Sequence, residues 1–260
     1  MRATAAIFGA SLAMALACGS IAQTAWGGYL KGREPETRSI LPPAPEVGSP
    51  RDLADRAIFK ATRVLKDTPR WALAASDARI SIVDLLRDFS CSTGVNLDEK
   101  DAPALALVLR RVVPDMVSAY SIPKDAYKRP RPYLRDPGEI CVDRSDDLAK
   151  SWDYPSGHAT FAWTAGLILA ELAPDRAGPI LTRARAYGES RAICGVHSAS
   201  AVTEARTAGS SLVAALHGDP MFRADVEAAR AEMAALRTAQ VADRPERCDV
   251  EAALTAKTPW

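Results

Sequence analysis

The chain has 260 residues, enough for one sizeable hydrophobic core. Hydrophobic residues make up 48% of it and charged residues 25%, which are ordinary values for a soluble globular protein and argue against a collagen, a coiled coil or a disordered chain. The formal net charge of +1 lacks the basic excess that is typical of nucleic-acid binding. We therefore expect a globular protein that does not bind nucleic acid.

The first 22 residues have the pattern of a secretory signal peptide. Arg2 precedes an apolar stretch that is shorter than the roughly 20 residues needed to span a bilayer. A small-x-small cleavage signal then places the mature start at Gln23, with Trp26 as a second candidate and Cys18 as a weaker, lipoprotein-like site. We expect a periplasmic or secreted protein whose mature chain has no transmembrane segment.

The mature chain keeps an even number of cysteines: Cys91, Cys141, Cys194 and Cys248. In an exported protein this number predicts two disulfides. Three pairings are possible, and the sequence leaves all three open.

The rest of the chain predicts a single helical domain over residues 51–260, preceded by an extended arm over residues 23–50. The arm is rich in proline and glycine and shows no hydrophobic period. Ser49 is placed to cap the first helix, with Pro50 at its first position. Apolar residues at helical spacing predict helices over about 50–65, 71–76, 80–89, 101–120, 157–172, 179–191, 198–216 and 220–238.

Residues 121–154 are predicted to be a long, proline-rich connection, and connections of this length inside a domain are usually functional. No stretch shows the alternation of a strand. The fold class is therefore all-α, with a helical-bundle core.

Only three histidines occur in the chain, and His158 has an unusual setting. It ends the segment Pro155-Ser156-Gly157-His158, which lies directly before an apolar helix. The free N–H groups and the dipole at a helix N-terminus attract an anion. Gly157 lets the backbone approach a ligand closely.

Several basic residues precede His197, the second histidine with an unusual setting, in the sequence. His197 lies six residues after Arg191, and Lys124 and Arg131 lie upstream, with a proline on each side of Arg131. Cations neutralise the oxygens of a transferring phosphoryl group, while one histidine attacks and another protonates the leaving group. The pattern favours a phosphoryl-transfer site.

Three short blocks in this order resemble the signature of the phosphatidic acid phosphatase type 2 superfamily. That superfamily includes the bacterial class A non-specific acid phosphatases and the vanadium haloperoxidases. The export signal and the single domain favour the secreted acid phosphatases within it. The blocks are Lys124-x6-Arg131-Pro132, Pro155-Ser156-Gly157-His158 and Ser190-Arg191-x5-His197.

The resemblance implies a role for each matching residue. His197 is the expected nucleophile, and His158 is the expected general acid and then base. The substrates are small phosphomonoesters, no metal or other cofactor is implied, and vanadate would bind as a phosphate mimic. The expected phosphate ligands are the side chains of Lys124, Arg131 and Arg191 and the backbone N–H groups of Ser156 and Gly157.

The chain departs from the family pattern at one position. The family has an aspartate four residues after the nucleophilic histidine, where this chain has Ala201. Such a carboxylate accepts a hydrogen bond from Nδ1–H and leaves Nε2 free to attack. Ser200 is a candidate replacement, whereas Glu204 lies about 10 Å away along a straight helix. We expect impaired catalysis, or an acceptor that the sequence does not reveal.

Two other functions stay open at this point. Ala201 motivates a non-catalytic phosphate- or phosphoester-binding protein, and the same pocket is compatible with a vanadate-dependent haloperoxidase. Lys128 and Arg129 are expected at the surface, and His217 at a helix C-terminus. The helical faces leave room for a homodimer.

Overall fold

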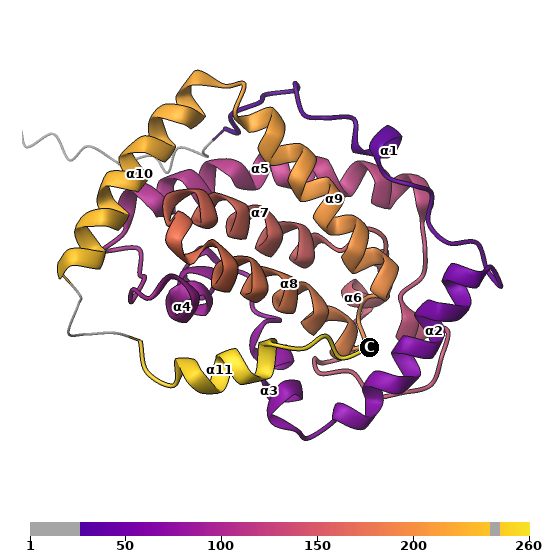
Figure 1. The fold of residues 1–260 in the computed structure, drawn as a ribbon. Coiled ribbons are helices and arrows are strands. Elements are labelled where there is room, and N and C mark those ends of the chain that lie inside the picture. Colours follow the sequence, from indigo (N-terminus) through magenta and orange to yellow (C-terminus); the bar gives the residue numbers. More distant parts are fainter. Residues whose placement is uncertain (1–26, 240–244) are drawn as a thin grey trace, which may run out of the picture.

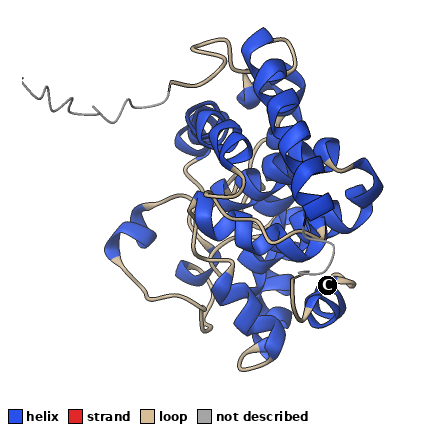
Figure 2. Cartoon of the chain, turned by 90° about the vertical axis from the view of Figure 1, so that its left-hand side faces the viewer, coloured by secondary structure: helices blue, strands red, loops and turns tan. Residues whose placement is uncertain are grey.

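The computed structural model describes residues 27–239 and 245–260. The expected signal peptide lies outside these residues. Within the described ranges the chain forms helices and loops and no strand, as Figure 2 shows. The prediction of an all-α fold is therefore confirmed.

Eleven α-helices and three short 3-10 helices follow one another in the described chain. The α-helices are α1 Thr37–Ile40, α2 Pro50–Thr62, α3 Pro69–Ser76, α4 Ile82–Thr93, α5 Pro103–Tyr127, α6 Asp146–Lys150, α7 Gly157–Leu172, α8 Ala177–Ile193, α9 Ala199–Leu216, α10 Pro220–Ala239 and α11 Cys248–Thr255. The 3-10 helices are Arg63–Leu65, Pro132–Leu134 and Pro174–Arg176.

Helix α7 is the centre of the bundle. It packs against α8, α9, α5 and α10, and Figure 1 shows these helices gathered around it. The sequence of α7 is apolar on nearly all sides, which is the pattern of a helix enclosed by others. Because α7 begins at Gly157, its N-terminus brings His158 to one end of the core.

Helices α7 and α8 come into close contact at a small residue. A β-carbon added to Gly166 of α7 would lie 2.5 Å from the β-carbon of Ala184 on α8. Only glycine fits at this crossing, because neighbouring carbon atoms pack at about 3.5–4.0 Å. The crossing fixes how α8, which carries Arg191, lies against α7.

The N-terminal arm packs onto the core. The backbone N–H groups of Tyr29 and Leu30 donate to the carboxylate of Asp115 on α5, and both side chains are buried. The arm also contains the short helix α1, so it is not extended throughout. Ser49 caps α2 through its side chain, as predicted.

The connection before the second block is shorter than predicted. Helix α5 continues to Tyr127 and contains Pro114 and Pro123, so residues 121–127 are helical. The prediction that the helix ends near residue 120 was wrong, because Pro123 and Pro130, on either side of its actual end, favoured a loop there. Lys124 therefore lies in the last turn of a helix that is anchored in the core.

The structure forms both expected disulfides and selects one pairing. Cys91 bonds to Cys248, and Cys141 bonds to Cys194. The second bond ties the connection to the end of α8, three residues before His197. Across the described residues, no helix combines the length and hydropathy needed to cross a membrane.

Candidate active site

The three sequence blocks meet at one pocket of about 240 Å³. Its polar side comes from all three blocks, and its apolar side comes from α5 and the loop before α4. The residues that line it are Ile80, Met116, Tyr120, Lys124, Arg131, Ser151, Gly157, His158 and His197. Among the described residues, no group of three histidine, cysteine or acidic side chains is placed to hold a metal ion.

Lys124 is held against the pocket by α5. Its ammonium lies 5.5 Å from the ring centre of Tyr120, and the side chain is buried. Burial, and next the charge of Arg131, lower the pKa of Lys124 to about 8. The ammonium is thus charged at acidic and neutral pH and available to an anion.

Arg131 is fixed by backbone and side-chain acceptors. It donates to the carbonyl and hydroxyl oxygens of Ser151, at 2.8 and 3.0 Å, and to the carbonyl of Val196 at 2.7 Å. Burial lowers its pKa, but a guanidinium stays protonated. The result is a fixed positive charge beside His197.

Arg191 carries buried donors that no protein group in the described residues pairs with. Its side chain is buried on α8, and Nε and Nη1 have no hydrogen-bond partner among the described residues. Burial lowers the pKa of Arg191 to about 10, so it is charged at neutral pH. Buried donors of a charged group are costly unless they are paired, and a phosphate oxygen would pair them.

The tautomer of His197 is fixed at both ring nitrogens. Nδ1 lies 2.7 Å from the carbonyl oxygen of Asp153, which only accepts, so Nδ1 carries the hydrogen. Nε2 lies 3.0 Å from Nη1 of Arg131, which only donates, so Nε2 carries the lone pair. Burial and the nearby cations hold the pKa of His197 well below its ordinary value. The imidazole is neutral with a nucleophilic Nε2.

His158 has the opposite arrangement. Its Nε2 lies 3.2 Å from the carbonyl of Ala78, so Nε2 carries a hydrogen and Nδ1 is the nitrogen that gains or loses a proton. Burial, and next the charge of Arg191, hold the pKa of His158 well below its ordinary value. A bound dianion would raise that pKa again, because it favours the charged imidazolium.

Gly157 and Ser156 have different surroundings. Gly157 lines the pocket at the first position of α7, where a backbone N–H has no partner within the helix. The Ser156 N–H, in contrast, donates to the carbonyl of Ala201 at 3.1 Å, and its hydroxyl caps α7. The structure therefore favours a structural role for Ser156 in place of the phosphate contact expected from its N–H.

Asp153 is a site residue that the sequence analysis missed. Its carboxylate oxygen Oδ1 lies 3.1 Å from Nδ1 of His197, next to its own carbonyl. Ser200, the candidate acceptor, instead donates to Asp55 on α2. One signal was present: an acid between two aromatic residues, two positions before the Pro155–His158 block.

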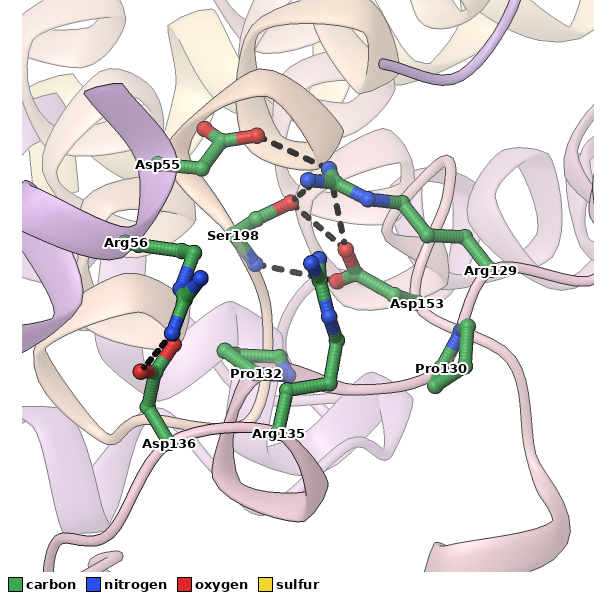
Figure 3. Close-up of a pocket in the computed structure, with 9 residues that line it drawn as sticks. All are labelled: Asp55, Arg56, Arg129, Pro130, Pro132, Arg135, Asp136, Asp153 and Ser198. Carbon is green, nitrogen blue, oxygen red and sulfur yellow. Dashed lines mark hydrogen bonds and ion pairs between the residues drawn. The ribbon is translucent and has the colours of Figure 1, made fainter. Parts of the chain in front are cut away.

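Arg129 is also part of the site, and its prediction as a surface residue was wrong. The side chain is 6% exposed and forms ion pairs with Asp52, Asp55 and Asp153. A cation next to Lys128 reads as part of a solvated face, but only Lys128 is exposed. Figure 3 shows the guanidinium of Arg129 between Asp55 and Asp153, beside a small pocket.

His217 and Ala201 occupy the expected elements. His217 follows the last residue of α9 and pairs with Glu171 at 3.0 Å, outside the pocket. Ala201 is buried in the first turn of α9 and brings no polar side chain to His197.

Comparison with known proteins agrees with this geometry. The sequence pattern of the PAP2 superfamily matches residues 103–223, which contain all three blocks. The chain belongs to the PAP2 superfamily.

Within that superfamily the chain is similar to several bacterial proteins. It is 39% identical to an acid phosphatase of Zymomonas mobilis over 212 residues, which cover 81% of this chain and 80% of the relative. It is 36% identical to a non-specific acid phosphatase of Providencia stuartii, covering 80% and 86% of the two chains. A non-specific acid phosphatase of Salmonella typhimurium is 32% identical, covering 74% and 78%.

Proposed function

We propose that the protein is an acid phosphatase that hydrolyses small phosphomonoesters through a phosphohistidine at His197. The observation that carries the proposal is the fixed tautomer of His197, with the lone pair of Nε2 facing the cations of the pocket. The acid phosphatase names of the relatives support the reaction class.

The first step forms a bond between Nε2 of His197 and phosphorus. The ester P–O bond breaks, and the leaving oxygen takes the proton on Nδ1 of His158. Lys124, Arg131 and Arg191 neutralise the phosphoryl oxygens, together with the Gly157 N–H at the start of α7. The products are the free alcohol and a phosphorylated imidazole.

The second step reverses the roles of the same groups. His158, now neutral, removes a proton from water as the water oxygen attacks phosphorus. The N–P bond breaks, and Nε2 of His197 regains its lone pair as inorganic phosphate forms. His158 ends protonated, ready for the next substrate.

An acidic optimum follows from the first step. His158 must carry a proton when the alcohol leaves, and burial and cations lower its pKa in the free protein. Activity should fall as pH rises through the pKa of His158 in the substrate complex.

The proposal includes export and vanadate binding. The two disulfides are compatible with an oxidising compartment, which supports the periplasm or the exterior. Vanadate would occupy the phosphate pocket and inhibit hydrolysis. A homodimer stays a prediction.

Hydrolysis of p-nitrophenyl phosphate by the chain starting at Gln23, measured across about pH 4–8, tests the proposal. His197→Ala should lower kcat by on the order of 10⁵-fold, because no nucleophile is left. His217→Ala is the matched control, since this histidine is 42% exposed and lies outside the pocket. It should keep full activity, and brief mixing with substrate should trap acid-labile phosphate on wild type and on His217→Ala but not on His197→Ala.

Two outcomes would contradict the proposal. Absence of turnover together with protection of the fold by phosphate would indicate the non-catalytic binding protein. Halide oxidation with added vanadate and peroxide, without ester hydrolysis, would indicate the haloperoxidase. The impaired catalysis expected from Ala201 stays a prediction. The contact of the Asp153 carboxylate with His197 is relevant to it, because it places an acid beside Nδ1.

A further inference from the structure

We propose that Asp153 is the positioning residue for His197 and supplies, from outside α9, the carboxylate that position 201 lacks. The proposal rests on the function proposed above, because it assigns the group that prepares the nucleophile. The side chain of Asp153 is fully enclosed by the protein, with 1% of its surface exposed.

The groups that contact the Asp153 carboxylate are hydrogen-bond donors and one guanidinium cation. Oδ1 accepts from the Ser198 N–H at 2.9 Å and lies 3.1 Å from Nδ1 of His197. Oδ2 accepts from the Ser198 hydroxyl at 2.6 Å and lies 3.4 Å from Nη1 of Arg129. Burial raises the pKa of Asp153, and the charge of Arg129 opposes that rise. A shell made only of donors selects the ionised carboxylate.

The geometry of the α9 N-terminus explains why Asp153 can take this role. Ser198 is the N-cap residue and its hydroxyl accepts from the Ala201 N–H, which makes 201 the third helical position. In a capping box, an acidic side chain at that third position accepts the N–H of the N-cap residue. Alanine has no acceptor, and the Ser198 N–H donates to Asp153 instead. The carboxylate of Asp153 therefore lies where one from position 201 would reach.

Arg129 holds Asp153 in place from the other side. The backbone N–H of Asp153 donates to the carbonyl of Arg129 at 2.8 Å. The guanidinium donates to Ser198 Oγ and to Asp55, both at 2.8 Å, so the serine hydroxyl hydrogen is directed to Asp153. Figure 3 shows this chain of contacts. The support extends to α2, which provides Asp52 and Asp55.

The negative charge of Asp153 stabilises His197 most after its Nε2 has attacked phosphorus. The imidazole of His197 becomes positive when Nε2 bonds to phosphorus, and its Nδ1–H then donates to a carboxylate at 3.1 Å. The carbonyl of Asp153 orients the ring, but only the carboxylate adds a full opposite charge. Removing it should lower kcat more than it raises KM.

The test exchanges the carboxylate between the two positions. Asp153→Ala should lower kcat about 10²- to 10⁴-fold with little change in KM. Ala201→Asp alone should also lower kcat, because it adds a second buried carboxylate beside Asp153. The double variant Asp153→Ala/Ala201→Asp should recover at least about tenfold over Asp153→Ala. Nitrogen NMR shifts of His197 in the same variants report its tautomer without requiring turnover.

Asp136→Asn is the matched control. Asp136 is also a buried carboxylate and lines the same small pocket, but it pairs with Arg56 and not with His197. It should keep kcat and the His197 nitrogen shifts. The inference is overturned if Asp153→Ala keeps both wild-type kcat and wild-type nitrogen shifts, or if the folded double variant shows no recovery. Lack of turnover in wild type would overturn the proposed function alone, and the NMR comparison would still decide the role of Asp153.

Discussion

In the structure, Nη1 of Arg131 donates to the same His197 nitrogen that is proposed to attack phosphorus. The bond keeps the lone pair of Nε2 directed at the cationic side of the pocket. It must also be exchanged for a bond to a phosphate oxygen before attack. In the proposed mechanism, Arg131 thus orients His197 and then binds the phosphoryl group that His197 attacks.

Anion binding should be coupled to proton uptake at His158. Burial and cations lower the pKa of His158 in the free protein, and a bound dianion raises it, so lower pH favours binding. Sulfate stays a dianion between about pH 5 and pH 7, and its affinity should rise by up to about tenfold per unit of falling pH. Titration calorimetry of wild type and His158→Gln would measure this, and equal slopes in both would contradict it.

Lys124 should limit anion binding at the alkaline end. Its pKa of about 8 means that the ammonium loses its proton as pH rises through this value, and with it one positive charge of the pocket. Sulfate affinity should therefore fall between about pH 7 and pH 9. Lys124→Arg keeps its charge there and should flatten the decline, and calorimetry that showed the same decline in both proteins would exclude Lys124 as its source.

Two helix N-termini meet at the site. Ser156 caps α7 and Ser198 caps α9, and the Ser156 N–H donates to the Ala201 carbonyl in the first turn of α9. The starts of the two helices are therefore linked directly. Because α8 packs against α7, the position of Arg191 depends on the same packing.

The Gly166 crossing should be sensitive to a single methyl group. Gly166→Ala adds a β-carbon 2.5 Å from Ala184, and the resulting overpacking should lower the free energy of unfolding by about 1–3 kcal/mol. Gly178→Ala is the matched control on α8. A β-carbon added there would have no atom from another part of the structure within 4 Å, so the change should be neutral or slightly stabilising. Urea unfolding compares the two, and equal stability of both variants would contradict the argument.

The sequence was enough to predict most of the helices, but not the buried residues that hold His197 in place. The long apolar run Gly157–Leu172 was predicted as a helix with correct bounds. The short helix Asp146–Lys150 has too few residues to show a period. The blocks identified both histidines from local spacing. Asp153 and Arg129 were missed because their role depends on contacts with Ser198 and α2, which lie far away in the sequence.

The two disulfides join different parts of the structure. Cys91–Cys248 ties α11 to α4, away from the pocket. Cys141–Cys194 ties the connection between α5 and α7 to the turn that carries Val196 and His197. Arg131 donates to the Val196 carbonyl, so this disulfide supports the arrangement of Arg131 and His197 as well as the fold.

Removing each disulfide should separate stability from activity. Cys91→Ala/Cys248→Ala should lower the free energy of unfolding by about 2–4 kcal/mol and keep kcat. Cys141→Ala/Cys194→Ala should lower stability by a similar amount and also lower kcat by on the order of tenfold or more, because His197 and Arg131 lose their fixed spacing. Thermal unfolding and steady-state kinetics would check this, and equal kcat in the two variants would contradict it.

The placement of Asp153 beside the first turn of α9 has an evolutionary consequence. A chain with acids at both 153 and 201 would bring two negative charges together, and a chain with neither would leave Nδ1 of His197 without a carboxylate. Either intermediate should be less fit, so the two positions should change in concert and show strong epistasis. A search that requires an acid at position 201 would class such chains as inactive, whereas one that accepts an acid at either position would retain them.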